Sequence, residues 1–159
     1  MSYSSWEFFY DLIGENINSG KIKQFICDIN ERPKINKYNF DKGCYYTFRY
    51  FGIDLETNSN IIRRIFLRNL GDSGHFSRCS KLKPFSGDLP FNISFHDSIS
   101  TVEEKSNLYC DNNQDISFYN GNKKVRVKIV FKYCHNKYDA DAVKHILIEL
   151  ENWKIGILA

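Results

Sequence analysis

The amino-acid sequence predicts an α+β fold in which short helices cover one face of an antiparallel β-sheet of about six strands. Three observations lead to this prediction. Apolar residues recur at helical spacing near the N-terminus, later segments alternate between apolar and polar residues, and aromatic residues make up 16% of the chain, with 13 Phe and 10 Tyr. The two periods are those of amphipathic helices and half-buried strands, and aromatic rings pack well across strands.

Two short helices are expected near the N-terminus, over residues 6–13 and 21–30. Their apolar residues recur at helical spacing, which places them on one side of each helix. These stripes are Trp6, Phe9, Tyr10 and Ile13, and Ile22, Phe25, Ile26 and Ile29. Ser4 and Glu7 have the spacing of a capping box, and Pro33 prevents the second helix from continuing.

The remaining elements are mostly strands. They are expected over residues 44–51, 52–56, 61–69, 89–95, 115–120, 123–133 and 142–151. The Asn-Gly-Asn sequence at 120–122 is typical of a hairpin turn. A third helix is expected to begin near Ser98 or Ser100, because Ser100 and Glu103 again fit a capping box.

The chain is long enough for one domain with its own core. We expect a single domain over residues 1–159, with halves at 1–69 and 89–159 joined by a long surface loop at 70–88. Helical residues precede a strand meander in both halves, so we also expect a tandem structural repeat.

The cysteines favour a cytoplasmic protein, and the charges do not favour one that binds nucleic acid. The net charge of +3 comes from 22 basic and 19 acidic residues, which is too even for a dedicated nucleic-acid surface. The N-terminus lacks the pattern of a secretory signal, and no apolar run is long enough to span a membrane. The number of cysteines is odd and none forms a CxxC motif, so we expect reduced thiols.

Two surfaces are candidates for binding a partner. The first is the polar face of the sheet, on which strand alternation places cations. It carries Arg49, Arg64, Phe66, Arg68, Arg126, Lys128 and Lys132. The second is the long loop, because loops of this length are often functional. It carries Asp72, His75, Phe76 and Phe85.

The cationic face has three interpretations. It is either a solvated face whose cations pair with Asp54, Glu56 and Glu149 across strands, or a docking surface for a protein, with arginine anchors and an exposed Phe. The third interpretation is a nucleic-acid-binding module, in which aromatic rings beside cations stack on bases. The strands contain no RNA-binding signature of the RNP1 type.

The sequence carries no recognised catalytic motif. It contains no GxGxxG, P-loop, HExxH or GxSxG pattern. Cys110, Cys134, His135 and His145 do not have the spacing of a common zinc site. We therefore expect no enzymatic activity, cofactor or metal, and a small hydrolase or nuclease with an unrecognised site has no positive sign in the sequence.

Four segments, in order, resemble bacterial immunity proteins of contact-dependent growth inhibition and related polymorphic-toxin systems. They are ERPKINKY, GCYYTFRYFGIDLE, NIIRRIFLRN and LPFNISFHDSISTVEEK, within a resemblance that covers roughly residues 8–150. The third helix of similar sequences tends to run into a Lys-Leu-Gly-Lys-Pro-like ending, whereas this chain reads Lys-Ser-Asn-Leu at 105–108.

The resemblance implies a non-enzymatic, cytoplasmic protein whose partner is the C-terminal toxic domain of a cognate protein toxin. Such proteins act by covering the active site of the toxin, so the resemblance brings no catalytic residues. The net charge of +3 disfavours a nuclease as the toxin, because an acidic protein best covers a basic active site.

Overall fold

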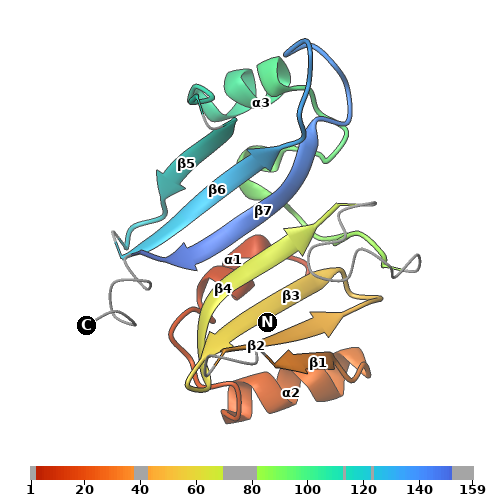
Figure 1. Ribbon diagram of the computed structural model, residues 1–159, viewed down its shortest axis with the longest axis vertical. Coiled ribbons are helices and arrows are strands. Elements are labelled where there is room, and N and C mark those ends of the chain that lie inside the picture. Colours follow the sequence, from red (N-terminus) through yellow and green to blue (C-terminus); the bar gives the residue numbers. More distant parts are fainter. Residues whose placement is uncertain (1–2, 38–42, 70–81, 113, 123, 152–159) are drawn as a thin grey trace.

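The computed structural model describes residues 3–37, 43–69, 82–112, 114–122 and 124–151. Its elements are α1 (Trp6–Tyr10), α2 (Gly20–Ile29), β1 (Lys34–Lys37), β2 (Gly43–Phe48), β3 (Ile53–Asn58), β4 (Ile61–Arg68), η1 (Pro90–Asn92), α3 (Ile99–Ser106), β5 (Asp115–Tyr119), β6 (Val125–Phe131) and β7 (Val143–Leu150). Figure 1 shows α1 behind the sheet at β4, α2 beside β1, and α3 near the start of β5.

The described strands form one antiparallel sheet in the order β1-β2-β3-β4-β7-β6-β5. This confirms the predicted α+β class with an antiparallel sheet, although the sheet has seven strands rather than about six. The strand that the sequence analysis missed is β1. Its residues are all exposed, so it lacks the alternation by which the other strands were predicted.

The two halves of the sheet meet where β4 pairs with β7, with Ile65 opposite Ile148. On each side of this seam the strands follow one another in chain order, as in a meander. One half has two helices and four strands, while the other has one α-helix and three strands. The tandem repeat therefore stays a prediction.

Strand register gathers the apolar side chains on the face toward α1. Cross-strand partners share a face of a sheet, so aligned apolar residues form continuous rows. One row runs Phe48, Ile53, Leu67, Ile146, Ile129 and Ile116. Every side chain in this row is fully buried, so the row forms the floor of the core.

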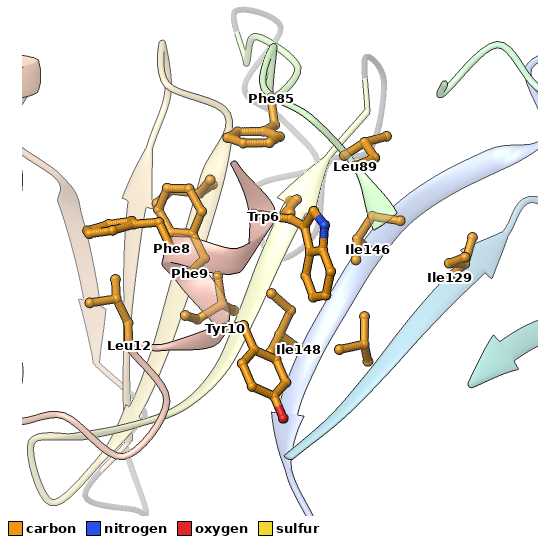
Figure 2. Close-up of a cluster of buried hydrophobic side chains, with 14 of the residues drawn as sticks. Trp6, Phe8, Phe9, Tyr10, Leu12, Phe85, Leu89, Ile129, Ile146 and Ile148 are labelled. Carbon is orange, nitrogen blue, oxygen red and sulfur yellow. The ribbon is translucent and has the colours of Figure 1, made fainter. Parts of the chain in front are cut away.

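Helix α1 lies over this floor and contacts both halves of the sheet. Phe9 packs edge-on against Phe25 of α2 and against Phe85, with ring centroids 5.7 and 5.6 Å apart. On the other side, the centroid of Trp6 lies 5.9 Å from that of Phe118 in β5. Figure 2 shows Trp6 on the side of Ile146, with Phe9 directed away from it.

Serine side chains cap the three α-helices among the described residues. Two of these serines differ from the ones that the capping-box spacing indicated. Ser5, rather than Ser4, accepts a hydrogen bond from the backbone of Glu7 in α1. Ser98, rather than Ser100, caps α3 by accepting from the amide of Thr101 at 3.1 Å. Helix α1 also ends at Tyr10 instead of continuing to residue 13.

The prediction of a strand over residues 89–95 is wrong. Pro90 begins the short helix η1, and Phe91 has left-handed backbone angles, with φ +57°. Proline cannot donate to a strand ladder, and a left-handed residue breaks extended geometry. The alternation in this segment reflects burial without a strand, since Ile93 and Phe95 are buried while Phe91 is 37% exposed.

Gly52 has a backbone position that no other residue can occupy without strain. Its φ is +87°, and an added Cβ would lie 2.2 Å from the backbone nitrogen of Phe85. Gly121 offers a matched control, because its φ is +80° and an added Cβ would have no neighbour within 4 Å. Comparison of the two positions separates backbone strain from steric overlap.

We expect Gly121→Ala to lower the free energy of unfolding by about 1–2 kcal/mol through backbone strain alone. Gly52→Ala should cost about 1–3 kcal/mol more, because the methyl group forces the segment of Phe85 away. Urea unfolding followed by circular dichroism measures both values. Equal losses for the two variants would contradict the described packing of residues 84–85 on the turn.

Candidate protein-binding surface

The sheet face away from α1, called here the outer face, carries a row of alternating charges. Register places these side chains opposite one another on successive strands, from β2 to β5. The charge row consists of Tyr45, Glu56, Arg64, Glu149, Arg126 and Tyr119. Each cation of the row therefore has a carboxylate beside it on a neighbouring strand.

Three cations of the outer face, Arg64, Arg126 and Lys128, pair with glutamates. Arg64 donates from Nη2 to Oε1 of Glu56 at 2.8 Å, and its Nε bonds the other carboxylate oxygen. Arg126 and Lys128 both contact Oε1 of Glu149, at 3.1 and 3.2 Å. Both glutamates are buried. These contacts confirm the predicted cross-strand pairing, which leaves less positive charge available to a ligand than the sequence pattern indicates.

Arg68 is buried and offers no contact to a partner. Its side chain is 1% exposed, its Nε lies 2.9 Å from Oδ2 of Asp54, and its Nη2 donates to the carbonyl oxygen of Phe48 at 2.7 Å. Moving two charges out of water costs several kcal/mol per ion, and the attraction between the paired charges offsets this cost. The pair therefore belongs to the scaffold.

Two further residues of the predicted face lie at its margins. Phe66 is half-buried, with its ring 5.3 Å from that of His145 and 5.7 Å from the guanidinium carbon of Arg64. Lys132 follows β6 and is also half-buried, and its amide donates to the carbonyl of Ala142 at 2.7 Å. Phe66 thus supports the ion pair of Arg64 rather than standing alone as an exposed anchor.

Of the loop residues predicted to contact a partner, the structure describes Phe85 alone. Phe85 is 4% exposed and packs against Phe9 and Phe51, so it belongs to the core and we remove it from the candidate surface. Asp72, His75 and Phe76 lie outside the described residues.

The sequence analysis missed a concave surface at the start of β1 and the end of β2. We call it the Tyr50 basin. It has a volume of about 470 Å³ and is lined by Ile29, Asn30, Glu31, Arg32, Pro33, Lys34, Arg49 and Tyr50. Arg49 is the only residue of the predicted cationic face among these lining residues.

The basin forms because α2 ends sharply and the chain then turns toward the end of β2. Asn30 has left-handed backbone angles, with φ +52°, and Pro33 blocks further helix. The carboxylate of Glu31 accepts hydrogen bonds from the amides of Tyr50 and Phe51, at 3.1 and 2.9 Å. These bonds hold the two walls of the basin together.

Most of the charged side chains that line the basin are cations, and they are exposed or half-buried. Arg32 and Lys34 are exposed, and Arg49 is half-buried. Tyr50 is 61% exposed, and Nζ of Lys83 lies 5.7 Å from the centroid of its ring. Within the described residues, Arg32, Arg49 and Lys83 form no ion pair. Tyrosine and arginine carry much of the binding energy at protein interfaces.

No group of three His, Cys, Asp or Glu residues among the described residues is arranged to hold a metal ion. Cys27, Cys44, Cys110 and Cys134 are free thiols, and burial, with the nearby charge of Asp111, raises the pKa of the Cys110 thiol to about 11. A thiol of that kind is a poor nucleophile at neutral pH.

Among the described residues, no helix has the length and apolar character needed to cross a membrane. Neither family models nor curated proteins match the chain.

Solved structures that the chain resembles include two secreted or extracellular proteins, as their names describe them. One is an extracellular protein containing an SCP domain from Bacillus anthracis, with TM-score 0.51 and 8% identity over 98% of this chain and 49% of that chain. The other is a cysteine-rich secretory protein from Staphylococcus aureus, with TM-score 0.48 and 9% identity over 89% of this chain and 46% of that chain. The chain spans about half the length of these proteins, and the first match shows a shared fold alone.

The buried pair of Arg68 and Asp54 generates a stability prediction. We expect Arg68→Ala to lower the free energy of unfolding by about 3–5 kcal/mol, because it leaves a carboxylate buried without its cation. Arg126→Ala is the matched control, with an expected loss below about 1 kcal/mol, because Arg126 is 32% exposed. Guanidinium unfolding of both variants gives the two values, and a loss at Arg68 no larger than at Arg126 would contradict the assignment of Arg68 to the scaffold.

The start of β5 generates a pH prediction. Burial, together with the hydrogen bond and charge of Asp111, raises the pKa of Asp115 above its ordinary 3.8. The folded protein therefore holds this proton more tightly than the unfolded chain, so stability is lost as pH rises from 3.8 through the folded pKa. We expect Asp115→Asn to raise the melting temperature at neutral pH and to give no gain below pH 3.8.

Melting temperatures of the wild type and the variant, measured at neutral pH and below pH 3.8, test this prediction. Asp139→Asn, at an exposed position, is the control for removing one negative charge. An Asp115→Asn variant that melts below the wild type at neutral pH would show that Asp115 is stabilised, rather than strained, by its surroundings.

Proposed function

We propose that this chain is a non-enzymatic immunity protein of the bacterial cytoplasm, which binds a cognate toxin domain and neutralises it by covering the active site. The resemblance of its segments to immunity proteins is the first support. The observation in the structure that carries the proposal is the Tyr50 basin, where an exposed tyrosine lies beside Arg32 and Arg49 on an anchored turn.

The basin has the composition and the rigidity expected of the centre of a protein interface. Arginine and tyrosine are enriched among residues that dominate binding energy. Side chains held on fixed backbone lose less entropy on binding than those on mobile loops. A stable complex would bury about 1,200–2,000 Å² in total, so the contact would extend beyond the basin onto β1 and the end of β2.

The nucleic-acid alternative draws less support from the same structure. It requires available cations on the outer face, but Arg64, Arg126 and Lys128 contact buried glutamates there. Binding phosphates at these positions would require the ion pairs to separate, which offsets part of the gain. This alternative stays a prediction, and its signature would be a steep loss of binding with salt.

Co-expression tests the proposed function. The probe is the C-terminal domain of the polypeptide encoded next to this chain in its host genome, produced from an inducible promoter in a bacterial strain. We expect its induction to stop growth, and expression of this chain to restore growth. The two proteins should co-purify in equal amounts, as measured by light scattering after gel filtration.

The control is an unrelated toxin of known activity, which this chain should not neutralise. Growth arrest that persists although both proteins are produced in folded form would contradict the proposal. A restored growth rate without a complex would contradict the mechanism, because occlusion requires binding.

A further inference from the structure

We propose that the Tyr50 basin binds an acidic segment of the partner protein, with carboxylates that meet the guanidinium groups of Arg32 and Arg49. This inference rests on the proposed function only in naming the toxin as that partner. The chemical class of the segment follows from the charges of the basin itself.

The first argument is the charge balance of the surface. Arg32 and Arg49 line the basin, and Lys83 lies over the ring of Tyr50. The lining contains one carboxylate, that of Glu31, and two backbone amides already donate to it. The cations of the basin therefore outnumber its carboxylates. They lie close together, and salt screens charges incompletely over such short distances.

The second argument is the contrast with the outer face of the sheet. There Arg64, Arg68 and Arg126 each meet a carboxylate of this same chain. Arg32 and Arg49 meet none among the described residues. The chain supplies carboxylates to the arginines of its scaffold, so a partner is the natural source of carboxylates for those of the basin.

The third argument is preorganisation. Glu31 fixes the turn through the amides of Tyr50 and Phe51, and the amide of Lys83 donates to the carbonyl of Arg49 at 2.8 Å. The ring of Phe51 packs against Phe25, with centroids 5.3 Å apart. The backbone that carries the basin is therefore anchored to the core, and a planar guanidinium on fixed backbone suits two-point binding of a carboxylate.

A plainer interpretation is that these cations are only solvated. In that case an acidic ligand would respond to the net charge of the protein, and charge reversal at any exposed position would weaken binding equally. The two interpretations differ in position dependence, which a matched pair of variants measures directly.

The probe is a short fluorescein-labelled peptide that alternates glutamate and serine, and its control is the same peptide with glutamine in place of glutamate. Fluorescence anisotropy at low salt gives the affinity for the full chain. The basin variant is Arg32→Glu with Arg49→Glu. The matched variant is Lys124→Glu with Lys144→Glu, which makes the same change in net charge at exposed positions on the other half of the sheet.

We expect the acidic peptide to bind the wild type and the matched variant with affinities within about threefold of each other, and to bind the basin variant at least about tenfold more weakly. The glutamine peptide should bind none of them measurably. Thermal melts confirm that each variant is folded, and Arg32→Gln with Arg49→Gln replaces the basin variant if reversal prevents folding.

Three results of the anisotropy measurements would overturn the inference. They are no binding of the acidic peptide, equal weakening by the basin and matched variants, and tighter basin-dependent binding of a single-stranded oligonucleotide of similar charge. The proposed function fails separately, through the co-expression experiment. Rescue of growth that persists in the basin variant would reject the acidic-segment inference while keeping the immunity function.

Discussion

The packing of α1 across the seam between β4 and β7 is the constraint on which the rest of the structure depends. Only one pair of strands joins the two halves of the described sheet. Phe9 of α1 packs into the first half, while Trp6 reaches Phe118 in the second. Full burial of a large apolar side chain contributes about 1.5–3 kcal/mol, so a few rings on one short helix add to the pairing of β4 with β7 in holding the two halves together.

This arrangement decides where the charges of the chain can lie. Because α1 and the apolar rows fill one face, the strands place their polar side chains on the outer face, where cross-strand register brings opposite charges together. A chain with net charge +3 thereby keeps several of its cations paired. Arg32 and Arg49 of the Tyr50 basin stand apart because they lie beyond the ends of β1 and β2, outside the strand register that pairs the other arginines.

Much of the fold could be predicted from the sequence. Strand β6 alternates between buried and half-buried residues over its whole length, while β4 and β7 are rich in the branched apolar residues that favour strands. One interpretation of the cationic face paired Asp54, Glu56 and Glu149 with its cations, and the structure adds the partners, Arg64 for Glu56 and Arg126 for Glu149. Alternation could not predict the burial of Arg68, which arises from long-range packing. It also misled at residues 89–95, where Pro90 and the left-handed Phe91 outweigh an alternating pattern.

The Tyr50 basin lay beyond local pattern reasoning for a different reason. Its two walls, residues 29–34 and residues 49–50, are brought together by the bonds from Glu31 to backbone amides, and periodicity carries no information about such contacts. The ERPK sequence at 31–34, with a helix stop beside two cations, was the available signal.

Hydrogen–deuterium exchange with and without the polypeptide encoded beside this chain tests the central claim most directly. The claim is that the sheet is a rigid scaffold and that binding occurs at the basin. It predicts that complex formation slows exchange of the backbone amides in residues 29–34 and 49–51 and leaves exchange in β5 and β6 unchanged. Protection confined to β5 and β6, or protection absent from the basin in a stable complex, would contradict it.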